Sequence, residues 1–295
     1  MANLKAIRVR LSSVKSTRQI TSAMKMVAAS RLRRAQDRIV QLRPYADKLN
    51  EILIGLNHAL SETETENIYA ARKTGRDRVL LILLTSNKGL CGGFNANVIR
   101  ETRRLIADKY TGQMRRGDLF FMPIGKKGND VLRRLKLNIL EEHNDIYSNL
   151  TFENTKELSD RLINLYLTKE FDRIEIIYNQ FKNAAVQRLT TEVFLPVQDQ
   201  APGKSEPLPS DYIYEPDQVR IVEELIPKSL RIQFYKALLD SFAAEHGARM
   251  TAMHQATDNA TELIRELTLQ YNKARQAAIT NQLLEVVSGA EALKG

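Results

Sequence analysis

The residues with the clearest potential for chemistry lie in one glycine-rich segment, SNKGLCGGFN, at residues 86–95. An apolar run at 78–85 precedes this segment and a helical pattern at 95–109 follows it. Glycine-rich turns between a strand and a helix N-terminus often bind phosphate, because free backbone N–H groups and the helix dipole converge there. Nucleotide binding by an α/β enzyme through Gly89–Gly93 is therefore one hypothesis.

The spacing within this segment fits neither common phosphate-binding motif. The sequence lacks GxxxxGK[ST], and Gly89, Gly92 and Gly93 do not form GxGxxG. The alternative is a structural turn in which these glycines supply positive φ angles and close packing. Cys91 would need a basic partner to act as a nucleophile, and no histidine lies near it in the sequence. A packed thiol is the simpler interpretation.

The composition of the chain argues against a structural metal site, an internal disulfide and a membrane-spanning helix. A single cysteine permits neither an internal disulfide nor a CxxC metal site, and the four histidines show no i, i+4 pairing. We therefore expect a reducing compartment, no structural metal and no cofactor. The longest apolar run, Val79–Leu84, is far shorter than the roughly 20 residues that a membrane-spanning helix needs, so we expect no transmembrane segment.

The middle of the chain alternates between strand and helix patterns. This order predicts an α/β domain with a mostly parallel, Rossmann-like sheet. The expected strands cover 78–85, 118–124, 173–180 and 186–197, and the last alternates as a sheet-edge strand does. The expected helices cover 95–109, 129–135 and 151–168, with GKKG at 125–128 as a turn and a capping arrangement of Asn154 and Glu157. Four prolines within 198–216 predict an exposed loop.

One long helical pattern precedes this domain in the sequence, and a second follows it. The first has a heptad seam with alternating spacings of four and three: Ala35, Ile39, Leu42, Ala46, Leu49, Leu53, Leu56 and Leu60. The second averages about 3.6 residues per step: Met253, Ala256, Ala260, Leu263, Leu267, Tyr271, Ala274 and Ala278. Neither stripe can be buried by its own helix, so we expect an antiparallel coiled coil of the two termini.

These patterns divide the chain into three parts. We expect an N-terminal shaft helix at 1–60, a central α/β domain at 61–217 and a C-terminal shaft helix at 218–295. Pro44 and Pro227 interrupt the helical patterns and should bend or break them. Pro227 could either begin the C-terminal helix or kink it.

The net charge of the chain is concentrated in the first helix. Residues 1–60 contain twelve Lys or Arg and three Asp or Glu. Their net charge is therefore +9, which equals the formal net charge of the whole chain. Residues 1–34 contain nine basic side chains and no acidic one. Solvated helix faces usually mix both signs of charge, so we expect an acidic partner beside this helix.

Other interpretations of the basic helix stay open. It could be a solvated face, or a transit peptide, although the apolar stripe continues into the heptads whereas a transit peptide is removed. A basic coiled-coil nucleic-acid-binding protein also places basic residues before heptads. Such a zipper pairs with itself and would leave the C-terminal stripe unburied, and no aromatic residue precedes Tyr45 to stack on single-stranded bases.

Four segments closely resemble the gamma-subunit family of F-type ATP synthases. They are ITSAMKMVAASRLRRAQ at 20–36, SNKGLCGGFN at 86–95, ARMTAMHQATDNA at 248–260 and YNKARQAAITNQLLEVVSGAEAL at 271–293. The resemblance implies a non-catalytic rotor shaft that couples ion-driven rotation of a membrane ring to ATP synthesis or hydrolysis at the beta subunits. Its implied partners are the alpha and beta subunits of the catalytic hexamer, the epsilon subunit and the ring of c subunits, with no nucleic acid.

The same resemblance implies which residues contact the beta subunits. These are Met24, Lys25, Arg249, Arg275, Gln276, Thr280 and Glu285. Each could instead be a solvated residue on a helix face. The lack of a leader implies a bacterial protein, peripheral to the cytoplasmic face of the inner membrane, and a single cysteine leaves no regulatory dithiol.

Overall fold

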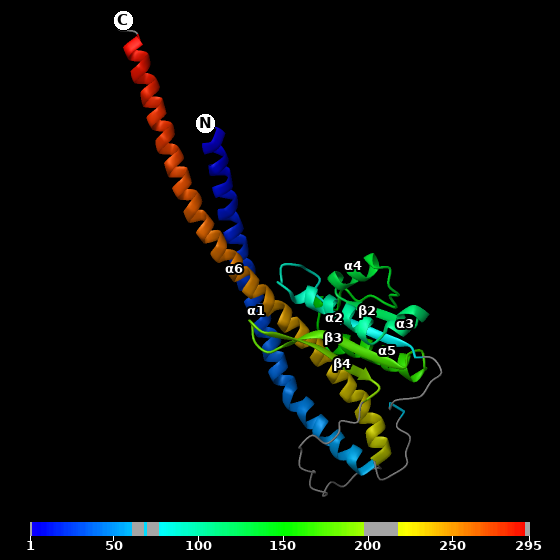
Figure 1. Cartoon of the computed structure of the whole chain (residues 1–295). Coiled ribbons are helices and arrows are strands. Elements are labelled where there is room, and N and C mark those ends of the chain that lie inside the picture. Colours follow the sequence, from blue (N-terminus) through cyan, green and yellow to red (C-terminus); the bar gives the residue numbers. More distant parts are fainter. Residues whose placement is uncertain (1, 61–67, 70–76, 198–217, 293–295) are drawn as a thin grey trace. The chain divides into compact units, whose positions relative to one another are not determined.

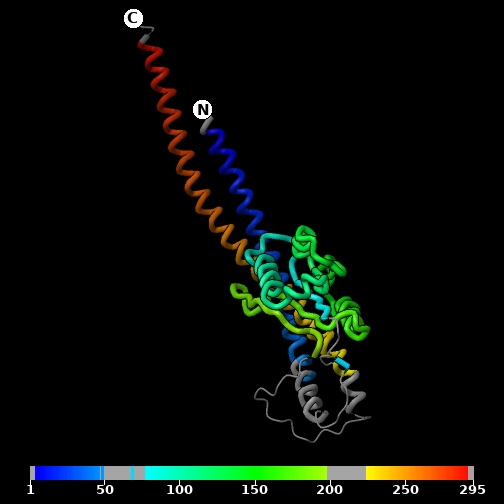
Figure 2. Tube along the Cα trace, turned by 45° about the vertical axis from the view of Figure 1, so that its right-hand side comes forward, coloured from blue at the N-terminus to red at the C-terminus, as the bar shows by residue number. Residues whose placement is uncertain are grey.

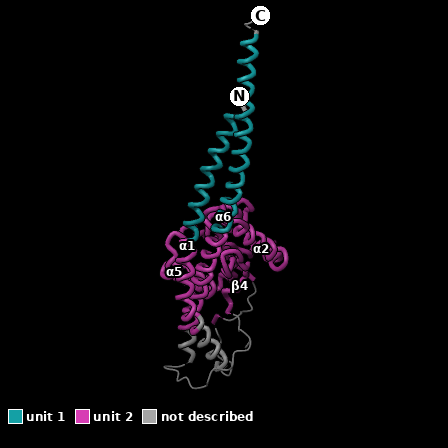
Figure 3. The backbone as a smooth tube through the Cα atoms, turned by 90° about the vertical axis from the view of Figure 1, so that its left-hand side faces the viewer, with its two compact units in different colours: residues 1–29, 249–295 teal, residues 30–248 magenta. Residues whose placement is uncertain are grey.

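The structure is a computed structural model that describes residues 2–60, 68–69, 77–197 and 218–292 (Figure 1). Two compact units make up the chain. Unit 1 consists of Met1–Ala29 and Arg249–Gly295, and unit 2 consists of Ser30–Ala248 (Figure 3). The division falls inside the two long helices, α1 (Ala2–Leu60) and α6 (Gln218–Ala292), whereas the expected domain boundaries fall at their inner ends.

A four-stranded sheet forms the centre of unit 2. Its strands are β1 (Val79–Leu84), β2 (Leu119–Ile124), β3 (Arg173–Phe181) and β4 (Gln187–Leu195), in the spatial order β2-β1-β3-β4. β1 pairs in parallel with β2 and β3, while β4 pairs antiparallel with β3 at one edge of the sheet. The predicted α/β class and mostly parallel sheet are confirmed.

Helices cover both faces of this sheet. Helices α2 (Phe94–Asp108) and α4 (Lys126–Arg134) pack on one face, where Val98 and Leu132 meet Val79, Leu81 and Leu83. The short helix α3 (Thr111–Arg116) lies beside α2 and β2. Because both sheet faces are covered, β1 is buried along its whole length, which explains why its sequence is uninterrupted and apolar.

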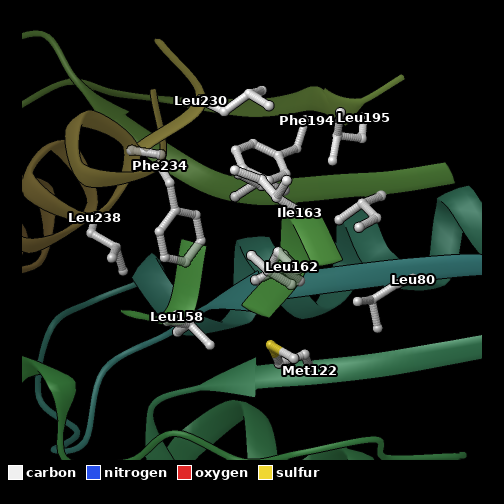
Figure 4. Packing of buried hydrophobic residues seen from close by; sticks show 14 of the residues in the cluster. Leu80, Met122, Leu158, Leu162, Ile163, Phe194, Leu195, Leu230, Phe234 and Leu238 are labelled. Carbon is white, nitrogen blue, oxygen red and sulfur yellow. The ribbon is translucent and has the colours of Figure 1, made fainter. Parts of the chain in front are cut away.

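The opposite face carries helix α5 (Phe152–Leu167) and the inner part of α6. Leu80 and Met122 from the sheet pack there with Leu162 from α5 and Phe234 from α6 (Figure 4). The segment of α1 inside unit 2 joins this core at its margin through Ile39 and Leu42.

Polar contacts fasten these helical segments to the α/β core. The Arg231 guanidinium lies 2.6 Å from an Asp160 carboxylate oxygen on α5, and Arg38 donates a hydrogen bond of 2.7 Å to the Leu150 carbonyl oxygen. The inner parts of both long helices therefore belong to the α/β core, which is why the compact units divide within the helices.

Two local predictions are wrong. The segment GKKG is not a turn, because α4 begins at Lys126 directly after Gly125. The cap of α5 is Thr151, whose side-chain oxygen accepts a hydrogen bond of 3.4 Å from the Asn154 backbone N–H. Thr151 has extended backbone angles, which suit an N-cap residue, whereas Asn154 already lies within the helix.

Both interior prolines lie within helices. Pro44 lies inside α1 and Pro227 lies inside α6, so Pro227 does not begin the C-terminal helix. The proline-rich segment at 198–216 lies outside the described residues, as do the side chains of Leu53, Leu56 and Leu60 in the heptad seam.

Unit 1 is an antiparallel pair formed by the outer parts of α1 and α6. The two helices run side by side, and the N- and C-termini lie at the same end of the unit (Figure 2). Ala28 of α1 is buried, as are Met253, Ala260 and Leu267 of α6. All eight residues of the predicted C-terminal stripe are buried or half-buried, because the stripe faces the partner helix.

Candidate functional site

A polar pair lies inside the helix pair of unit 1. The hydroxyl oxygens of Thr21 and Thr257 are 2.8 Å apart, and the Thr257 hydroxyl donates its one proton to the Met253 carbonyl oxygen at 2.7 Å, which leaves it to accept from Thr21. Thr21 is itself buried. A hydrogen bond between two such hydroxyls is satisfied in only one helix register, so this pair specifies the alignment of α1 against α6. The sequence does not predict this pair, because both positions are polar gaps in an apolar pattern.

The expected beta-subunit contacts have different exposures in unit 1. Met24 and Lys25 are half-buried on α1. On α6, four of the expected residues are exposed: Arg275, Gln276, Thr280 and Glu285. Arg249 is only 8% exposed, so it presents little surface to a partner.

The basic side chains of α1 in unit 1 have no acidic partner among the residues that the structure describes. None of the six forms an ion pair in the part of the chain that the structure describes: Lys5, Arg8, Arg10, Lys15, Arg18 and Lys25. All but Lys25 are exposed. In the described residues, α6 therefore forms no ion pair with these cations.

The outer end of α6 exposes apolar side chains. Residues 281–291 are all exposed, and Val286 reaches 70%. The large exposed apolar residues from 279 to 291 are Ile279, Leu283, Leu284, Val286 and Val287. Exposed apolar side chains gathered over a few helical turns indicate a protein interaction site.

The glycine-rich loop of unit 2 joins β1 to α2. Gly92 has a φ of +57°, whereas Gly93 precedes α2 with a φ of −79°. Leu90, which is not a glycine, also has a left-handed φ of 62°. Of the three glycines expected to supply positive φ, only Gly92 does so.

Backbone N–H groups near this loop already have partners inside the protein. Asn95 accepts from the Ser86 N–H at 2.9 Å, and Asn87 accepts from the Lys126 N–H at 2.9 Å. The Gly128 N–H donates to the Thr85 hydroxyl at 2.9 Å. Donors that are paired in this way are not free to bind a phosphate group.

The glycine that the fold requires most is Gly125, for which the sequence predicts only a place in a turn. Its φ is 104°, and a Cβ atom there would overlap the backbone carbonyl of Thr85. A Cβ at Gly128 would also come within 2.8 Å of the Thr85 hydroxyl. The ends of β1 and β2 therefore meet at a separation that only glycine permits.

Cys91 is a packed residue. It is buried against Phe94 and Ala244, and its Sγ atom accepts a contact of 3.3 Å from the Asn95 side-chain amide. These surroundings match the interpretation of a structural thiol.

We expect the isolated chain to show no stoichiometric binding of Mg-ATP in titration calorimetry, because the loop has neither common phosphate-binding motif and the N–H groups of Ser86, Lys126 and Gly128 are paired internally. A matched titration of an Asn87→Ala variant tests this reason. That variant frees the Lys126 N–H, and any weak anion affinity should appear there before it appears in the wild-type chain. Saturable one-to-one binding by the wild-type chain would contradict the prediction and support the nucleotide-binding hypothesis.

Two buried carboxylates of unit 2, Glu175 and Asp240, have shifted pKa values that their packing and hydrogen bonds explain. Burial alone would raise the pKa of Glu175, but hydrogen bonds, led by the one from Lys109, outweigh burial and lower this pKa below its usual value. Lys109 and Arg173 each lie 2.6 Å from the same Glu175 oxygen. Burial raises the pKa of Asp240 to about 6. Neither carboxylate belongs to the glycine-rich loop, so the loop gains no acid or base from them.

Among the described residues, no cluster of three or more His, Cys, Asp or Glu side chains is suited to a metal ion. No described helix is both long and apolar enough to cross a membrane.

Comparisons with known proteins agree along the whole chain. The family model described as ATP synthase matches residues 3–293. The ATP synthase gamma chain of Flavobacterium johnsoniae is 56% identical over 297 residues, and the match covers 100% of both chains.

Solved structures show the same fold. A central-stalk and c-ring structure of the mitochondrial ATP synthase from Tetrahymena thermophila contains a chain with a TM-score of 0.60 and 26% identity, covering 80% of this chain and 99% of that one. A rotor chain of the Euglena gracilis mitochondrial ATP synthase has a TM-score of 0.66 at 20% identity, covering 94% of this chain and 99% of that one. With a family model and a 56% identical relative that both span its length, this chain belongs to the gamma-chain family of ATP synthases.

Proposed function

We propose that this chain is the rotating central stalk of a bacterial F-type ATP synthase, on the cytoplasmic face of the inner membrane. It couples ion-driven rotation of a membrane ring to ATP synthesis or hydrolysis at the beta subunits, and it performs no catalysis itself. The observation that carries this proposal is the surface of unit 1: a two-helix rod with unpaired basic side chains on α1 and exposed apolar side chains at the end of α6.

The geometry of unit 1 suits a shaft. The part of α6 in this unit, 249–292, is about 65 Å long at 1.5 Å per residue. Its faces differ, because one helix carries unpaired cations and the other carries an apolar end. A rod of this kind gives three equivalent binding sites unequal contacts, and turning it changes which site receives which contact. Each rotary position thereby favours a different set of site conformations.

Six residues are proposed as contacts to the enclosing alpha and beta subunits. They are Met24, Lys25, Arg275, Gln276, Thr280 and Glu285. Lys25 and the unpaired cations near it are suited to acidic beta-subunit segments. Arg249 is left out because its side chain is almost fully buried. The exposed apolar end of α6 is suited to an apolar collar formed by the hexamer.

Co-purification tests the proposal most directly. The tagged full-length chain, expressed in its native cell, should recover the alpha, beta and epsilon subunits and the c ring. Recovery of nucleic acid without any ATPase subunit would support the basic coiled-coil alternative instead.

The double variant Arg275→Ala with Gln276→Ala should lower steady-state ATP turnover or coupled ion pumping of the reconstituted complex several-fold. Both side chains are exposed on α6, so the fold of the isolated chain should not change. Each lost hydrogen bond to a beta-subunit loop is worth about 0.5 to 3 kcal/mol in the rotary states that contain it. Turnover and pumping are measured side by side in vesicles.

A matched control removes the same chemical groups from the same helix. The variant Gln270→Ala with Lys273→Ala also deletes one amide and one cation at exposed positions. It should keep turnover close to the wild-type value. Equal losses in both variants would show that the effect comes from charge or helix propensity, and normal turnover in both would remove Arg275 and Gln276 from the proposed contacts.

A further inference from the structure

The helices on one face of the sheet in unit 2 carry a strong excess of basic residues. Residues 85–136, which include helices α2, α3 and α4, contain twelve Lys or Arg and four Asp or Glu, an excess of eight positive charges. All twelve basic residues are exposed. Helix α5, on the other sheet face, contains two basic and three acidic residues. Of the shorter helices that cover the sheet, those on the α2–α4 face therefore carry the excess of positive charge, and α5 does not.

Most of these cations are not used within the protein. Arg104, Lys109, Arg116 and Arg133 form ion pairs with carboxylates. Seven others form none in the described part of the chain: Arg100, Arg103, Arg115, Lys126, Lys127, Arg134 and Lys136. We refer to these seven residues as the basic layer. Unpaired cations on one face attract an anionic partner.

Apolar side chains stand among the cations. Met114 is 37% exposed and directly precedes Arg115, while Leu135 is 42% exposed between Arg134 and Lys136. Lys136 also adopts a left-handed φ of 53°, a conformation that glycine would adopt without strain. Cations interleaved with exposed Leu or Met are typical of surfaces that lie against lipid headgroups, where the apolar tips enter the acyl boundary.

We propose that the basic layer binds the anionic phospholipid headgroups of a membrane surface. A fluid anionic surface can neutralise cations spread over three helices, because its charges move laterally to meet them. Nucleic acid fits less well. Residues 85–136 contain no exposed aromatic side chain for base stacking, and a phosphodiester backbone offers Met114 and Leu135 no apolar surroundings.

Vesicle co-sedimentation of the full-length chain tests this proposal. The wild-type chain should bind vesicles of phosphatidylglycerol mixed with phosphatidylcholine, should not bind phosphatidylcholine alone, and should dissociate as salt is raised. Changing Arg103, Arg115, Arg134 and Lys136 together to Gln should lower the partition coefficient on the order of 100-fold, since each basic residue near an anionic surface contributes several-fold. Circular dichroism checks that the variant is folded.

A control variant distinguishes vesicle binding by the basic layer from an effect of net charge alone. Changing Lys5, Arg8, Arg10 and Lys15 to Gln removes four exposed cations from α1 and should lower the partition coefficient far less. Equal loss in both variants would overturn the proposal, as would equal binding to neutral vesicles or no binding by the wild-type chain. Release from vesicles by duplex DNA at equal phosphate concentration would also overturn it, in favour of nucleic acid. The assay contains no other ATPase subunit, so its outcome is independent of the rotor proposal.

Discussion

Replacing Gly125 with alanine should unfold the α/β core of unit 2. The residue has φ 104° and ψ 140°, which is essentially a glycine-only conformation and costs a side-chain residue about 1 to 3 kcal/mol. The new Cβ would also overlap the Thr85 carbonyl, a backbone group held in the sheet by the hydrogen bond from the Thr85 N–H to Ile124. We expect a total loss on the order of 4 kcal/mol or more, which is comparable to the whole stability of many domains.

Hydrogen exchange followed by mass spectrometry checks this prediction by region. Peptides from β1 and β2 should lose protection in the Gly125→Ala chain, while peptides from the helix pair of unit 1 should keep more of theirs. Gly117→Ala is the matched control, because Gly117 has a φ of +78° but open space around its Cβ position. It should cost about 1 kcal/mol from backbone strain alone. Similar stability of the two variants would show that the contact with Thr85 relaxes easily.

Replacing Leu263 and Leu267 together with Asp should separate the helices of unit 1. Leu267 is 3% exposed and Leu263 is half-buried, so both carboxylates would enter the seam without a partner. Losing a buried leucine costs about 2 to 5 kcal/mol, and burying an unpaired carboxylate adds several more. The outer part of α6 should then lose helicity in circular dichroism, because a long helix in water depends on packing of its apolar face.

The control places the same charges on the same helix outside the seam. Leu283→Asp with Leu284→Asp changes two exposed leucines, so the helicity of the isolated chain should change little. Assembly with the catalytic subunits should be lost in the seam variant, because the rod no longer exists. A seam variant with wild-type helicity and normal assembly would show that Leu263 and Leu267 do not hold the pair together.

Several elements could be predicted from the sequence because their signals are local. The continuous apolar run at β1 predicts a strand that is covered on both faces, and the structure buries all six of its residues. The stripe from Met253 to Ala278 predicts one buried face of a long helix, since its period follows the helical repeat. The glycine-rich loop likewise predicts a strand-to-helix turn, although only one of its three glycines has a positive φ.

Other features depend on segments that are far apart in the sequence. Gly125 is required because of Thr85, forty residues earlier, and Thr21 meets Thr257 only when α1 and α6 pair. Arg249 looks like an exposed contact in the sequence but is nearly buried in the fold. The basic layer has the same origin, because its cations become one surface only when α2 and α4 pack on the same sheet face. Periodicity reports which side of an element is buried, whereas close approach and surface charge depend on which elements the fold brings together.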